Sequence, residues 1–116
     1  MTDQAGLSPE DAKLVTLARA TRARARAGEG AAVRDLDGRT YAAASVRLEH
    51  LSLSALEVCV AMALSSGSTG LEAGVVLTDG EAPDLAAVTD FAGAGIPVMV
   101  GDPQGRVHST RSTGAE

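Results

Sequence analysis

Apolar residues recur at helical spacing near the start of the chain. One helical face carries Leu14, Leu17, Ala18, Thr21 and Ala25. Ser8 is a good N-cap, Pro9 suits the first helical position, and the acidic residues Glu10 and Asp11 favour the positive end of the helix dipole. The pattern therefore predicts a helix that begins near residue 9 and ends near residue 27.

The rest of the chain alternates short apolar runs with turn signals. Two strand-like runs, 31–35 and 40–46, flank Asp37-Gly38, a dipeptide typical of tight hairpins. The pattern then predicts a helix that starts at Ser52 or Ser54 and ends at Ser66. It also predicts a strand over 73–78, a helix over 84–92, and strands over 96–100 and 106–109. Strand–helix–strand units in the second half indicate an α/β sandwich with parallel strands in its centre.

The predicted helix over 54–66 has hardly any polar face. Its residues are apolar on nearly all sides, from Ala55 to Leu64. A helix of this kind is buried, either in the centre of its domain or against a partner subunit. Homo-oligomerisation, as a dimer or a tetramer, is therefore one expectation from the sequence.

Composition narrows the possible functions. The 116 residues fit a single domain, with tails over 1–7 and 110–116 that we expect to be flexible. A net charge of −5 and only two aromatic residues, Tyr41 and Phe91, argue against nucleic-acid binding. No stretch predicts a signal peptide or a membrane helix, so we expect a cytoplasmic protein. The single cysteine, Cys59, excludes an internal disulfide and a multi-cysteine zinc site.

Two segments resemble the signature of the zinc-dependent cytidine deaminase family. That signature is His/Cys-x-Glu on one helix and Pro-Cys-x-x-Cys at the start of the next. The matching segments here are Ala55-Leu56-Glu57 and Pro83-Asp84-Leu85-Ala86-Ala87. The resemblance spans roughly residues 37–106, and it implies a three-layer α/β/α sandwich with a mixed five-stranded sheet.

The same resemblance implies that the metal ligands are missing. The three ligand positions hold Ala55, Asp84 and Ala87, and an alanine side chain cannot bind a metal. Catalytic zinc needs three protein ligands and one open position for water. We therefore expect no metal cofactor, although zinc is usual in the family. Glu57, at the position of the family's general acid/base, is then either vestigial or an ordinary helix residue.

Two further positions differ from the family pattern. Ser45 and Arg47 stand where nucleoside deaminases carry the Asn and Glu that hold the ribose. Their loss argues against ordinary nucleoside binding. Arg47 instead favours an anionic ligand such as a phosphate or carboxylate, or it is a surface arginine without a ligand. The residues predicted to line the pocket are Ser45, Arg47, Ala55, Asp84 and Ala87.

Three interpretations of function remain open at this point. The first is a catalytically degenerate deaminase relative that acts as an oligomeric binding or regulatory module. The second is a divergent hydrolase of the nucleoside deaminase type that uses Glu57 and Asp84. The third is an unrelated α/β regulator in which the order of motifs is a coincidence. Other potential ligands, His50 and Cys59, lack the spacing of a helical metal site.

Overall fold

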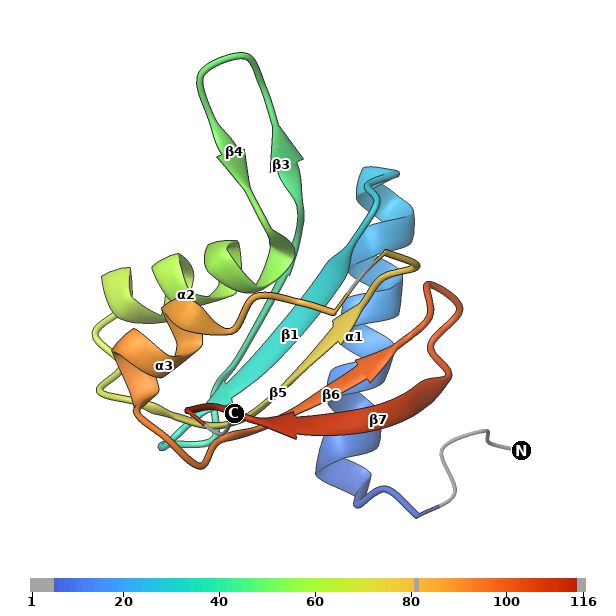
Figure 1. The fold of residues 1–116 in the computed structure, drawn as a ribbon. Coiled ribbons are helices and arrows are strands. Elements are labelled where there is room, and N and C mark those ends of the chain that lie inside the picture. Colours follow the sequence, from blue (N-terminus) through green and yellow to red (C-terminus); the bar gives the residue numbers. More distant parts are fainter. Residues whose placement is uncertain (1–5, 81, 115–116) are drawn as a thin grey trace.

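The computed structural model describes residues 6–80 and 82–114, and these form three layers (Figure 1). The central sheet has the strand order β2-β1-β5-β6-β7. Its strands are β1 (Gly30–Asp35), β2 (Thr40–Ala44), β5 (Leu71–Leu77), β6 (Pro97–Gly101) and β7 (Val107–Ser112). The helices are α1 (Pro9–Ala25), α2 (Ala55–Ser65) and α3 (Ala86–Ala92). The predicted α/β/α sandwich with a mixed five-stranded sheet is confirmed.

Small and branched apolar side chains fill the space on both faces of the sheet. Alternate residues of β1 face opposite sides, because side chains along a strand alternate with a period of two. Ala32 joins the cluster beneath α1, which includes Leu14 and Met99, whereas Val33 joins the cluster beneath α2 and α3. α1 therefore covers one face alone, and α2 and α3 cover the other (Figure 1).

The direction of the strands decides which segments meet at the edge of the sheet. β1 is antiparallel to β5, with Gly30 opposite Leu77, while β5 and β6 are parallel. The start of β1 and the end of β5 consequently lie at the same edge. This places residues 28–29 beside residues 78–80, and the pocket described below is built there.

The first helix begins where the sequence predicts. The Ser8 hydroxyl oxygen accepts a hydrogen bond of 3.1 Å from the Asp11 N–H, and Pro9 is the first helical residue. The helix ends at Ala25, two residues before the predicted end, and Arg26 takes a left-handed conformation with φ of 55°. None of the described helices is both long and apolar enough to cross a membrane.

Two features differ from the sequence prediction. A second hairpin, formed by β3 (Val46–Arg47) and β4 (Ser52–Leu53), stands out from the body of the domain (Figure 1). The expectation of a flexible tail from residue 110 is wrong as far as residue 113. β7 runs to Ser112, which pairs with Pro97, and Thr113 is buried. Residues 1–5 and 115–116 of the predicted tails lie outside the described residues.

Helix α2 is buried on one side only. Ala55, Leu56, Cys59, Val60 and Ala63 pack against the sheet. Met62 and Leu64, in contrast, are 36% and 58% exposed. Within a single chain, the expectation of a fully buried helix is therefore only half right.

Candidate functional site

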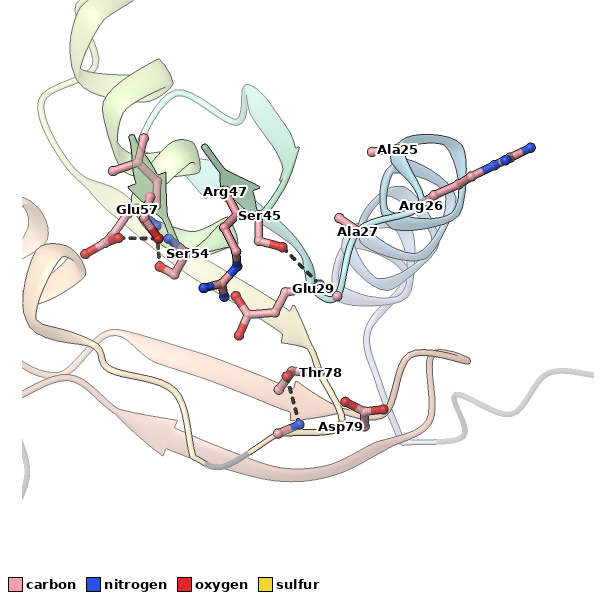
Figure 2. Close-up of a pocket in the computed structure, with 14 residues that line it drawn as sticks. Ala25, Arg26, Ala27, Glu29, Ser45, Arg47, Ser54, Glu57, Thr78 and Asp79 are labelled. Atoms are coloured by element: carbon pink, nitrogen blue, oxygen red, sulfur yellow. Dashed lines mark hydrogen bonds between the residues drawn. The ribbon is translucent and has the colours of Figure 1, made fainter. Parts of the chain in front are cut away.

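A pocket of about 700 Å³ opens at the edge of the sheet where β1 begins and β5 ends (Figure 2). The end of α1, the β3–β4 hairpin and the N-terminus of α2 complete its walls. Its lining is largely polar and includes Glu29, Ser45, Arg47, Ser52, Ser54, Glu57, Thr78 and Asp79. Three of the residues singled out from the sequence, Ser45, Arg47 and Glu57, share this pocket.

The carboxylate of Glu57 bonds to the start of its own helix. Glu57 Oε1 accepts a hydrogen bond of 2.8 Å from the Ser54 N–H. In return, the Ser54 hydroxyl oxygen accepts one of 3.1 Å from the Glu57 N–H. This reciprocal pair is a capping box, which satisfies two backbone donors that no helix can satisfy internally. The structure thus gives Glu57 a role that requires no substrate and no metal.

A second carboxylate, Glu29, reaches the same helix end from the start of β1. Glu29 Oε1 accepts a hydrogen bond of 3.2 Å from the N–H of Ala55, the first residue of α2. Ser45 holds the Glu29 backbone, since its hydroxyl accepts from the Glu29 N–H at 3.2 Å and its N–H donates to the Glu29 carbonyl at 3.1 Å. Two negative charges thus lie at the positive end of α2, which stabilises both.

Glu29 is not among the site residues predicted from the sequence. It lies in a Gly-Glu-Gly run between a helix and a strand, and the local pattern reads as a connecting loop. The pairing of β1 with β2 sets Ser45 beside Glu29, and the β3–β4 hairpin then returns the chain to the N-terminus of α2, 26 residues from Glu29 in sequence. Helix capping by a distant side chain leaves no periodic signal in the sequence.

The two arginines that line the pocket differ in direction. Arg47 extends from β3 over the pocket, whereas the side chain of Arg26 points away from it (Figure 2). Among the described residues, Arg47 has no ion pair and no side-chain hydrogen bond, and its side chain is exposed. Arg47 is therefore the only arginine directed at the pocket from the part of the chain that the structure describes.

The three predicted ligand positions lie behind or beside the pocket. Ala55 is fully buried. Asp84 is exposed, accepts a hydrogen bond of 2.9 Å from the Ala86 N–H, and borders a small cavity of about 30 Å³ with Ser54 and Glu29. Ala87 borders a different, apolar hollow of about 390 Å³ beside Val60. The start of α2 and the segment ahead of α3 therefore approach each other, and Asp84 and Ala87 border different hollows.

These residues do not fit a zinc ion. Two of the three positions carry methyl groups, and the third carries a carboxylate engaged with its own turn. Across residues 6–80 and 82–114, no group of three His, Cys, Asp or Glu side chains is placed to hold a metal. Cys59, the remaining soft donor, donates to the Tyr41 carbonyl, and burial raises the pKa of its thiol to about 12. A thiol with that pKa stays protonated near neutral pH and is a poor ligand.

The two acids of the hydrolase interpretation line different cavities. Glu57 lines the large pocket, and Asp84 lines the small cavity and the surface beyond it. General acid–base catalysis requires both groups within hydrogen-bond reach of one substrate. Glu57 is bonded to the start of its own helix and Asp84 to its own turn, and neither bond supports a reaction that uses the two carboxylates together.

Solved structures share the fold over most of their length. A cytidine deaminase from Burkholderia pseudomallei superposes with a TM-score of 0.72 at 22% identity, covering 92% of each chain. A cytidine deaminase from Mycobacterium leprae gives a TM-score of 0.68 at 20% identity, covering 91% of this chain and 94% of that one. No curated protein matches the chain in sequence. The three-layer sandwich is therefore of the cytidine deaminase type.

The family model described as "Cytidine deaminase-like" matches residues 7–105. The chain belongs to the cytidine deaminase-like family. This finding confirms the resemblance noted in the sequence and overturns the interpretation of an unrelated α/β regulator.

Proposed function

We propose that this chain is a catalytically degenerate member of its family, which binds a small molecule without deaminating it. The observation that carries the proposal is the state of the reaction centre. The three positions that match the family's metal ligands are Ala55, Asp84 and Ala87, and the Glu57 carboxylate is committed to the capping box. A hydrolytic deaminase needs an activated water and a proton shuttle, and the described residues supply neither.

The pocket itself supports retention of a binding function. Its volume of about 700 Å³ lies within the range of small-molecule sites, and charged and hydroxyl side chains line it. We therefore favour binding over a purely structural role.

We also propose that the chain acts as a homo-oligomer in the cytoplasm. The outward side of α2 exposes Met62 and Leu64, and Leu64 borders the apolar hollow formed with Val60, Ala87 and Phe91. A second copy that packs on this face would remove large apolar side chains from water, which favours association. Oligomerisation in turn suits a regulatory or scaffolding module.

An activity assay tests the catalytic part of the proposal. Purified protein is incubated with cytidine, deoxycytidine and cytosine, with and without an added zinc salt, and ammonia release is measured. We expect no release above that of buffer under either condition. Release that depends on added zinc, and that Glu57→Gln abolishes, would contradict the proposal and return Glu57 to a catalytic role.

A further inference from the structure

The charges in the pocket are not all compensated by their neighbours. Glu29 and Glu57 direct their carboxylates to the backbone N–H groups at the start of α2. Asp79, just beyond β5, and Arg47, on β3, also line the pocket and are exposed. In the described part of the chain, neither has an ion pair or a side-chain hydrogen bond. One cation and one anion therefore remain in the pocket without a partner.

Arg47 and Asp79 reach the pocket from different elements. Arg47 comes from the hairpin above it, and Asp79 comes from the strand end below it (Figure 2). They do not pair with each other, since no N–O distance between them is within 4.0 Å. A small molecule that carries both charges would offer a partner to each of them.

Hydroxyl groups add directed hydrogen-bond donors to this arrangement. The oxygens of Ser45 and Ser54 accept from the backbone N–H groups of Glu29 and Glu57, and the Thr78 oxygen accepts from the Gly80 N–H at 3.0 Å. Each hydroxyl retains its own proton to donate, because one O–H group both donates and accepts. A carboxylate held by Arg47 would find such donors on the same walls.

We propose that the pocket binds a free amino acid, with its carboxylate on Arg47 and its ammonium group on Asp79. This inference rests on the proposed function, since it concerns the same pocket. A simple anion would meet the carboxylates of Glu29 and Asp79, and a simple cation would meet Arg47. A neutral ligand such as a nucleoside would cover both charges without pairing them, which is costly. A ligand with both charges would pair with Arg47 and with Asp79 at the same time.

Thermal unfolding with a ligand panel tests the proposal. The panel contains the standard amino acids, β-alanine and 4-aminobutyrate to vary the charge separation, and cytidine. A ligand that binds with a dissociation constant of about 1 mM raises the unfolding temperature by about 5 °C at about 10 mM. We expect at least one amino acid to do so, and we expect its N-acetyl and carboxamide derivatives, which each lack one charge, to have no effect.

Two variants then locate the binding site by calorimetric titration with the amino acid that gives the shift. Arg47→Gln and Asp79→Asn are each expected to weaken binding about tenfold, because each removes one charge-assisted contact. The matched controls are Arg19→Gln, on α1, and Asp37→Asn, in the β1–β2 turn, which lie outside the pocket lining. Both controls should bind like the wild type.

The results of these experiments distinguish a failure of this inference from a failure of the proposed function. Protein that holds no zinc and shows no shift with any amino acid would overturn the inference and leave the proposed function intact. A shift with cytidine alone would also overturn it. A shift that Arg47→Gln and Asp79→Asn both leave unchanged would place the ligand elsewhere and contradict the assignment of this pocket.

Discussion

Ser54 and Glu57 exchange two hydrogen bonds at the start of α2, one of 2.8 Å to the Glu57 carboxylate and one of 3.1 Å to the Ser54 hydroxyl. The pair caps the N-terminus of α2, which faces the pocket. In a deaminase of this fold, the glutamate at this position serves the reaction. Here the same side chain has a structural partner, so its presence is explained without catalysis.

Substitution of Glu57 separates the structural role from a catalytic one. Glu57→Ala should lower the free energy of unfolding by about 1 kcal/mol, because the Ser54 N–H loses its acceptor. Glu57→Gln should cost only about 0.5 kcal/mol, since glutamine keeps the capping box and loses only the charge at the helix end. Urea denaturation measures both values. Equal losses in the two variants would contradict the capping role.

Glu29 is expected to stabilise the domain through its contact with Ala55. Glu29→Ala should lower the free energy of unfolding by about 1 kcal/mol, because the first N–H of α2 loses a charged acceptor beside the helix dipole. Glu49→Ala is the matched control, because the Glu49 side chain is 88% exposed at the tip of the second hairpin. If urea denaturation gives the same small change for both variants, the Glu29–Ala55 contact contributes nothing to stability.

The approach of α1 to the sheet depends on the absence of a side chain at Gly30. A Cβ atom there would lie 2.6 Å from Arg22 Cβ and would clash with the Ala18 carbonyl oxygen. Gly30→Ala should therefore cost about 1–3 kcal/mol, measured by thermal or urea unfolding. Gly28→Ala is the control, since a Cβ there meets nothing within 4 Å. A Gly30→Ala protein as stable as Gly28→Ala would mean that α1 packs less closely than described.

The hydrogen bonds to Asp35 lead us to expect that the folded protein loses stability in acid. The buried Asp35 carboxylate accepts hydrogen bonds from the Ser68 hydroxyl and from the backbone N–H groups of Arg39 and Asp37. These bonds, that of Ser68 foremost, hold the Asp35 pKa below its ordinary value. The unfolded chain then binds more protons in mild acid, so the stabilisation is complete above the ordinary aspartate range and is lost as the pH falls through the lower folded pKa.

Unfolding free energies measured from neutral pH down to about pH 3 test this linkage. Asp35→Asn should be less stable at neutral pH, and its stability should fall less steeply with acid than that of the wild type. Part of the slope should persist, because backbone N–H groups led by that of Arg106 also lower the pKa of Asp102. Parallel curves for wild type and Asp35→Asn would contradict the assignment.

The exposed side of α2 leads to a prediction about assembly. Light scattering should give the mass of a dimer or a tetramer for the wild type. Leu64→Lys should shift that mass toward the monomer, because it places a charge on the apolar face. Leu36→Lys is the control, since Leu36 is 62% exposed in the β1–β2 turn and does not line the apolar hollow beside Leu64. A monomeric wild type would contradict the proposed homo-oligomer.

Local signals predicted most of the fold. Ser8 and Pro9 marked the start of α1, Asp37-Gly38 marked the first hairpin, and the apolar run at residues 73–78 marked the central strand. Each of these depends on neighbours in sequence. Residues 110–113 were misjudged because all but Arg111 are small and polar, whereas their order comes from β6 and from the contacts of Thr113 with Ile96 and Gly93.

The site was predictable only where a motif existed. The spacing of Glu57 and Pro83 identified the deaminase pattern, and Ser45 and Arg47 were placed by the same resemblance. Glu29 and Asp79 were missed because the pairing of β1 with β5, and not a local motif, brings the start of one strand and the end of the other to the same pocket. The serine of the capping box was visible as a possible helix start, but the direction of the Glu57 carboxylate was not.

The most direct test of the account is the zinc content of untagged, purified protein, measured by plasma mass spectrometry. A metal-free deaminase fold predicts less than about a tenth of an equivalent of zinc per chain, because a stable site needs three or more protein ligands. Close to one equivalent per chain would contradict the account, because the positions assigned to Ala55, Asp84 and Ala87 would then not be those of the metal ligands.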